Sequence, residues 1–233
     1  MGYDVSFHPI SPEEMREWYF TPLSWVQQGQ EEKVLALAAQ HGIEDFYAEK
    51  YLDTLRVGAG TEPDELFDKS HGFYIAVIQG FFRDYYYTRG SAFSFLAEQN
   101  PDYTRYFTPW KQITPAPFPN PAKNQIVENY CSGVYLSSNQ VMQILQDINQ
   151  DSRIRTDLER FWSDGQFAVL KKALNAAAKL GVGLLEATEV VEPNPLQPNA
   201  STSYSNLYHC DRDGVYLYID TAIRQLADAF KER

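Results

Sequence analysis

The sequence predicts an α+β protein that is predominantly helical and has a few short strands in a small antiparallel or mixed sheet. Many segments place apolar residues at the spacing of an amphipathic helix, and shorter ones alternate apolar and polar residues as strands do. The composition, 44% hydrophobic and 15% aromatic, is that of a chain with a packed core. Its 233 residues can form one full core, so we expect a single domain over residues 1–233.

The first half of the chain begins with a strand over residues 3–10, which alternate in polarity. Ser11 then starts a helix, because Pro12 suits its first turn and Glu14 completes a capping box with Ser11. We expect this helix to end before Pro22, since proline interrupts a helix interior. The other segments predicted helical in this half are 30–41, 44–55, 66–89, 91–98 and 101–107, of which 66–89 is apolar nearly all round and therefore buried.

Five prolines fall between residues 108 and 122. Such a density predicts an extended connector without regular structure. The connector either straps one domain or divides the chain into an acidic helical part, residues 1–107, and a strand–helix part, residues 123–233. After it, the pattern predicts a strand at 127–136, helices at 138–149, 152–162 and 165–180, and a segment at 184–191 that fits either a strand or a helix end.

The C-terminal region combines strand and turn signals. Residues 204–208 alternate like a strand, and the Asp-Gly pair within 211–214 predicts a hairpin turn into a second strand, before a final helix. The tetrapeptide Gly-Val-Tyr-Leu occurs at 133–136 and again at 214–217. We interpret this repeat as two similar strand-to-helix units that are neighbours in one small sheet.

The strong negative charge, formally −11, narrows the classes of partner. Nucleic acids and anionic membrane surfaces are bound by basic faces, so the charge argues against both. Basic proteins, cations and cationic small molecules remain, and a charged solvated surface without a partner is the alternative. The sequence has no apolar run long enough to span a bilayer, and Cys131 and Cys210 are too few for a disulfide framework, which together predict a cytoplasmic protein.

Motifs that would commit the chain to a catalytic chemistry do not occur in the sequence. The four histidines lack the spacing of a metal site, and neither a nucleophile elbow nor a Gly-rich phosphate loop is present. We therefore predict no catalytic residue and no cofactor, and an enzyme is the less favoured class. Paired carboxylates for hydrolysis stay open, because their geometry is invisible in a sequence.

One segment partly fits a calcium-binding loop. With His209 at the first position, Asp211, Asp213 and Asp220 fall at positions 3, 5 and 12. The first position of such a loop requires Asp, however, and the last a bidentate Glu. A hairpin turn closed by Asp-Gly explains the same residues, so these three aspartates are only weak metal-ligand candidates.

Most of the excess negative charge lies in the first 70 residues, which hold 14 acidic and five basic residues, against 17 and 15 in the rest. Asp45, Glu49 and Asp53 are spaced four apart and would form one stripe along a helix, although like charges at this spacing cost roughly a few tenths of a kcal/mol per pair. Such a stripe is a candidate contact surface, and a solvated face is the alternative. The further acidic candidates for partner binding are Glu13, Glu17, Glu65 and Asp68.

The favoured function is a protein–protein interaction. An acidic protein without catalytic motifs suits a neutraliser of the immunity or antitoxin type, which binds a basic partner such as a toxin enzyme. Trp18, Tyr19 and Trp25 are candidate aromatic anchors beside the acids, or simply core residues. The alternative is a small-molecule-binding protein or hydrolase whose aromatic pocket contains a few carboxylates.

Overall fold

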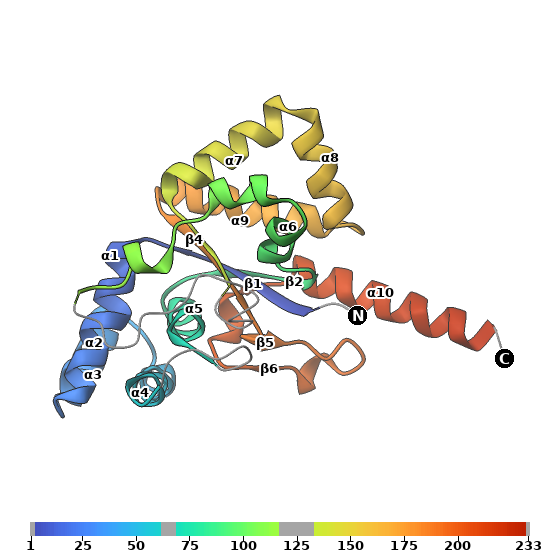
Figure 1. Cartoon of the computed structure of the whole chain (residues 1–233). Helices are drawn as coiled ribbons and strands as arrows, with labels where there is room; N and C mark the ends of the chain where they lie inside the picture. The colour runs from blue at the N-terminus through green and yellow to red at the C-terminus, as the bar shows by residue number, and fades with distance from the viewer. Residues whose placement is uncertain (1–2, 62–68, 117–132, 232–233) are drawn as a thin grey trace.

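The computed structural model describes residues 3–61, 69–116 and 133–231. It is predominantly helical with a small mixed sheet, which confirms the predicted α+β class. Helices that precede residue 83 cover one side of this sheet, and helices between residues 93 and 180 cover the other (Figure 1). No helix in the described ranges is long and apolar enough to cross a membrane.

The main sheet is built around the N-terminal strand, β1 (Tyr3–Ile10), which has the predicted bounds. It pairs in antiparallel fashion with β2 (Tyr85–Gly90) on one side and with β4 (Gly183–Thr188) on the other. The segment that fitted either a strand or a helix end is therefore a strand for most of its length. Helices also cover both faces of β1.

Shorter strands complete the sheet at its edges. β3 (Tyr135–Leu136) is antiparallel to β4, and β7 (Cys210–Asp211) is parallel to β2, so that the order is β3-β4-β1-β2-β7. β5 (Val191–Glu192) and β6 (Thr202–Ser203) form a separate antiparallel pair. The strand predicted at 127–136 is thus short in its described part, and residues 127–132 lie outside the described ranges. Strands on both sides of the 108–122 connector contribute to the one main sheet.

The alternation of β1 divides the core into two clusters. Val5 and Phe7 point into the cluster shared with the later helices, whereas Ile10 belongs to the cluster of the earlier ones. His8 lies opposite Val5 and Phe7, fully buried, with its ring nitrogens 2.7 Å from Gln79 Oε1 and 2.8 Å from Ser6 Oγ. Burial lowers the pKa of His8 to about 3, so this histidine stays neutral inside the fold.

The first helices follow β1 directly and begin with the predicted capping box. Ser11 Oγ accepts a hydrogen bond from the Glu14 amide at 3.1 Å, and Glu14 Oε2 accepts one from the Ser11 amide at 2.8 Å. The helical elements on this side of the sheet are α1 (Pro12–Met15), the π-helical turn η1 (Arg16–Phe20), α2 (Thr21–Gln27), α3 (Glu31–Gln40), α4 (Asp45–Ala59) and α5 (His71–Phe82).

The predicted helix end before Pro22 is wrong. The helix continues through Gln27, and the π-helical turn η1 immediately precedes the proline. In this turn the Thr21 amide bonds to the Arg16 carbonyl, five residues back. A wider turn at this point accommodates Pro22, which has no amide hydrogen to donate and lies in the first turn of α2.

The long helix predicted over residues 66–89 is also wrong beyond Phe82. α5 ends there, Arg83 adopts an extended conformation, and the chain continues as β2. Tyr85 and Tyr87 are fully buried on one face of β2, while Tyr86 between them is only half-buried. A run of consecutive aromatic residues is compatible with a buried strand as well as with a buried helix, because neither element requires a polar face.

The second helical group is close to the prediction. Its elements are α6 (Phe93–Gln99), the 3₁₀ turns η2 (Pro101–Tyr106) and η3 (Trp110–Gln112), α7 (Ser138–Gln150), α8 (Ser152–Phe161) and α9 (Gln166–Leu180). The turn η3 lies in the connector that we expected to lack regular structure, and it buries Trp110 in the first core cluster. Residues 117–122 of the connector lie outside the described ranges.

The predicted C-terminal hairpin is wrong. Short 3₁₀ turns, η4 (Pro198–Ala200) and η5 (Leu207–His209), precede β7, and Asp213 then begins the single long helix α10 (Asp213–Lys231). The second Gly-Val-Tyr-Leu segment is therefore helical, whereas the first contains β3, so the two copies are not equivalent units. Cys210 is a buried free thiol whose pKa burial raises to about 12, and Cys131 lies outside the described ranges.

Candidate functional site

The outer face of α4 carries the predicted acidic stripe. Asp45, Glu49 and Asp53 are all exposed, while the opposite face of the helix buries Tyr51 and Leu55. The buried face packs against α2, α3 and α5. Because the apolar and acidic positions alternate at helical spacing, burying one face necessarily presents the other to solvent.

An exposed aromatic ring lies within this acidic face. Phe46 is 63% exposed, and its ring contacts Tyr47 edge-on at a centroid distance of 5.1 Å. The Lys50 ammonium lies 5.0 Å from the centroid of the Phe46 ring. An exposed aromatic side chain surrounded by charges is the kind of residue that anchors protein–protein contacts. We call Asp45, Phe46, Glu49 and Asp53 the α4 surface.

Ion pairs neutralise only one end of the α4 surface. Arg56 Nη1 lies 2.8 Å from Asp53 Oδ1, and Arg56 Nη2 lies 2.6 Å from Glu31 Oε2 on α3. In the described part of the chain, neither Asp45 nor Glu49 has a basic group within ion-pairing distance. The carboxylates of the α4 surface that form no ion pair therefore lie in the first two turns of α4, beside Phe46 and Lys50.

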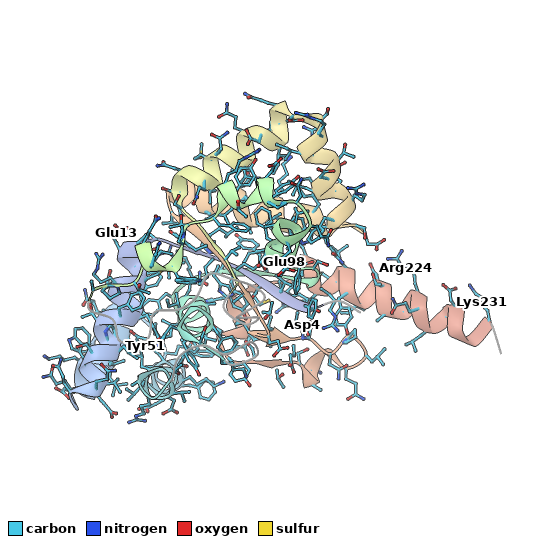
Figure 2. The ribbon with its side chains drawn as sticks, viewed as in Figure 1. Asp4, Glu13, Tyr51, Glu98, Arg224 and Lys231 are labelled. Carbon is cyan, nitrogen blue, oxygen red and sulfur yellow. The ribbon has the colours of Figure 1, made fainter. Side chains whose placement is uncertain are left out.

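The other predicted acidic residues do not join the α4 surface. Glu13 is exposed on α1, which Figure 2 shows at the other end of the N-terminal helices from Tyr51 of α4. Glu17 is exposed on η1 and its Oε1 lies 3.1 Å from His41 Nε2. Glu65 and Asp68 lie outside the described ranges. Of the candidate aromatic anchors, Trp18 and Tyr19 are buried in the core and Trp25 packs partly buried against it.

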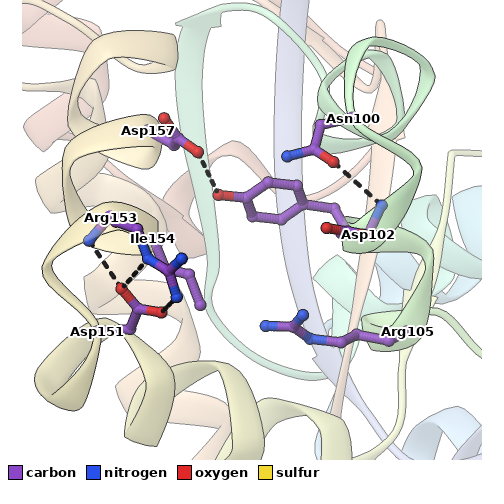
Figure 3. Close-up of a pocket in the computed structure, with 8 residues that line it drawn as sticks. Asn100, Asp102, Arg105, Asp151, Arg153, Ile154 and Asp157 are labelled. Carbon is purple, nitrogen blue, oxygen red and sulfur yellow. Dashed lines mark hydrogen bonds and ion pairs between the residues drawn. The ribbon is translucent and has the colours of Figure 1, made fainter.

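A polar cleft of about 200 Å³ lies between η2 and α8 (Figure 3). Most of its charged groups already have partners within the protein: Asp151 accepts hydrogen bonds from Arg153 at 2.8, 2.9 and 3.2 Å, and the Tyr103 hydroxyl lies 3.5 Å from Asp157. Arg105, at the edge of the cleft, pairs with Asp147 at 3.2 Å. Because most of these side chains already have partners, the cleft offers little to a charged ligand.

A second, more apolar groove of about 320 Å³ lies between α4, α5 and β6. Phe73 and Tyr74 of α5 line it together with Tyr204, and Lys69 lies at its edge. The Lys69 ammonium donates a hydrogen bond to the Tyr204 hydroxyl at 2.5 Å and lies 3.8 Å from the centroid of that ring. Asp53 also borders the groove. Sequence reasoning missed this site, because Lys69 and Tyr204 are 135 residues apart in the chain.

Two of the weak metal-ligand candidates, Asp211 and Asp213, lie close together, but the cation between them is the side chain of Lys172. Lys172 Nζ lies 2.6 Å from a carboxylate oxygen of Asp211 and 2.6 Å from one of Asp213. Asp220 is exposed about two turns further along α10. Over residues 3–61, 69–116 and 133–231, no three His, Cys, Asp or Glu side chains form a group that could hold a metal ion.

One buried carboxylate stands apart from these surfaces. Glu186 on β4 is fully buried and accepts hydrogen bonds from the Phe93 amide and from Ser94 Oγ at the start of α6. Desolvation raises the pKa of Glu186 to about 7, although these hydrogen bonds favour the ionised form. A group enclosed in this way contacts no solvent, so it caps the buried end of α6 and is not part of a surface site.

Comparison with known proteins found no match: no protein-family model, no curated protein sequence and no solved structure matches this chain.

Proposed function

We propose that this protein binds a basic protein partner through the α4 surface, as a neutraliser of the immunity or antitoxin type. The observation that carries the proposal is the exposure of Phe46 beside Asp45 and Glu49, two exposed carboxylates that form no ion pair in the described part of the chain, although Lys50 lies over the Phe46 ring. An exposed apolar side chain next to carboxylates that form no ion pair favours a partner of the opposite sign.

Charge and anchor would contribute at different stages of binding. The first 70 residues carry nearly all of the excess negative charge of the chain, which speeds the approach of a cationic protein. Toxin enzymes that cleave nucleic acids carry basic faces because their substrates are polyphosphates. Once the surfaces meet, burial of Phe46 in an apolar pocket of the partner would slow dissociation.

The test is affinity capture from the native host at low and at moderate salt, with three forms of the protein. We expect the native protein to retain one basic protein and to release it as salt rises. Asp45→Lys/Glu49→Lys should bind that protein at least about tenfold more weakly, because it reverses the charge beside the anchor. Glu98→Lys/Glu159→Lys changes the net charge equally at two exposed positions on α6 and α8 and should bind normally.

Equal retention by the two charge-reversed proteins would contradict the proposal, because binding would then depend on total charge and not on position. Phe46→Ala separates the anchor from the charges. It should weaken retention already at low salt, where the charges still act, since burial of an apolar ring is not screened by salt. Failure of all forms to retain a specific protein would also count against the proposal.

A second function, small-molecule binding, is favoured by the groove beside Tyr204. Its volume of about 320 Å³ falls within the range of ligand pockets, and aromatic side chains line it. Lys50 and Lys69 at its edge favour an aromatic ligand that carries a carboxylate.

We expect small aromatic carboxylates in excess to raise the melting temperature of the native protein. Tyr204→Ala removes one wall of the groove and should abolish that rise, whereas Tyr208→Ala, a change at an exposed tyrosine outside the groove lining, should preserve it. Indifference of the native protein to every such ligand would reject this function.

A further inference from the structure

Among the residues that the structure describes, contacts with the helix α10 are made along one side. Gly214 contacts β2 so closely that an added Cβ would lie 1.7 Å from the Tyr87 carbonyl oxygen. Leu217 packs over Gly165, and the Arg89 guanidinium lies 5.1 Å from the centroid of the Tyr218 ring. With Thr221 these residues follow at intervals of three and four, which defines a single face of the helix.

The opposite side of α10 is apolar and exposed. Tyr216, Ile223 and Leu226 are 55%, 54% and 43% exposed, and Ile219, which lies between them in sequence, is half-buried. At 3.6 residues per turn these four residues lie on the side of the helix that faces away from β2. We call them the α10 seam. The more apolar side of the helix is therefore the side that the described residues leave exposed, which is the reverse of the usual arrangement for a surface helix.

The second half of α10 extends beyond the body of the protein (Figure 1). From Ile223 onwards, every side chain that the structure describes is exposed. Short helices without tertiary contacts are only marginally stable in water. A helix that continues for more than two turns with an apolar side in solvent lacks the packing that normally stabilises such an element, and a partner on the seam would supply it.

We propose that the α10 seam pairs with the α10 seam of a second copy of this chain in antiparallel orientation. Successive seam residues are separated by three, four and three positions, which is the alternation that interlocks two helices. Pairing the two helices with their axes reversed and centred between Ile223 and Leu226 brings Ile223 of each copy opposite Leu226 of the other, so these two seam residues form the centre of the contact, while Tyr216 and Ile219 lie towards its ends.

The charges on α10 favour a second copy over the basic partner of the α4 surface. α10 holds three acidic and two basic residues in its described length, so it is nearly neutral. Two copies with a net charge of −11 each repel one another, and a near-neutral surface is where they can meet at least electrostatic cost. A cationic protein gains nothing from such a surface.

The placement of charge also selects the orientation. Asp220 and Lys231 lie on the same flank of the seam, about three turns apart. In the antiparallel arrangement Asp220 of one copy approaches Lys231 of the other, so both ends of the contact gain an attractive pair. A parallel arrangement would place this flank of the two copies on opposite sides of the contact, so it would bring no Asp220–Lys231 pair together.

Sedimentation velocity over about a hundredfold range of concentration tests the pairing. The contact spans about three turns per copy, at the small end of specific interfaces, so we expect the native protein to dimerise with a dissociation constant on the order of micromolar. Ile223→Glu should be monomeric throughout. Gln225→Glu, an exposed change outside the seam on the same helix, should dimerise as the native protein does. Since both positions are exposed, thermal unfolding should confirm that both variants fold.

A charge exchange tests the orientation. Asp220→Lys and Lys231→Asp should each weaken the dimer, and the double variant Asp220→Lys/Lys231→Asp should restore it, because it exchanges the two charges of each pair. A native protein that stays monomeric overturns the proposal, including the case in which other residues of the same chain cover the seam. A dimer that survives Ile223→Glu, or a double variant that stays weak, overturns it as well. None of these outcomes bears on the α4 surface.

Discussion

At the scale of single residues, burial shifts the pKa values of two ionisable side chains on neighbouring strands in opposite directions. His8 on β1 is kept neutral because burial lowers its pKa to about 3, and Glu186 on β4 is held partly protonated near neutral pH because burial raises its pKa to about 7. Both belong to the central strands of the sheet, where helices cover each face. Their titration is therefore coupled to folding.

We expect Glu186→Gln to remove a pH dependence of folding stability. The folded state retains the Glu186 proton up to about pH 7, whereas the unfolded chain loses it near the ordinary value of 4.5. The free energy of unfolding should therefore be highest, as far as Glu186 is concerned, below pH 4.5. It should fall by up to about 3 kcal/mol as the pH rises through 7.

Urea unfolding of the two proteins at several pH values measures this difference. His8 contributes a slope of the opposite sign below pH 6.5, but it is present in both proteins and cancels from the comparison. Identical pH dependence of the native protein and of Glu186→Gln would show that the folded carboxyl has an ordinary pKa.

At the scale of elements, the two segments that differ most from the sequence prediction are β2 and α10. The secondary structure of both segments depends on the elements that pack against them. β2 is a strand because β1 and β7 supply hydrogen-bonding partners on its two edges, which no local pattern of aromatic residues reveals. α10 is a helix although its Asp-Gly start resembles a hairpin turn, since Gly214 allows the helix to approach the β2 backbone directly.

Gly214→Ala should therefore detach α10 from β2. The new Cβ would overlap the Tyr87 carbonyl oxygen, so helix and strand must separate, at a cost of about 1–3 kcal/mol. Gly60→Ala is the matched control, because the nearest atom to its added Cβ is 3.8 Å away. Thermal unfolding should show a loss for the first variant only, and limited proteolysis should cut α10 faster. Equal stability of the two variants would contradict the close contact.

At the scale of the whole molecule, the two proposed interaction surfaces lie far from each other. α4 is at the lower left of Figure 1, and α10 extends from the opposite side of the protein. The first surface is acidic and the second nearly neutral. Pairing through α10 would consequently leave both α4 surfaces free, and a dimer would present two of them. Linked copies of one site bind a multivalent partner more tightly than either site alone.

Local sequence signals predicted much of this protein. The strand 3–10, the capping box at Ser11 and the helices of the second group depend on spacing within a few residues, which the chain carries in its own pattern. The exposure of Asp45, Glu49 and Asp53 follows in the same way from the apolar face opposite them. These features are determined by the sequence alone, because neighbouring residues decide them.

Only the tertiary structure decided the features that join distant segments. Arg56 links Asp53 to Glu31 on another helix, Lys69 meets Tyr204 across the groove, and the apolar side of α10 turns away from the body it is attached to. Hydrophobic periodicity indicates that a helix has an apolar side, but it does not indicate which part of the protein that side packs against. That choice depends on which elements the fold brings together, and for α10 the described residues leave the apolar side largely exposed.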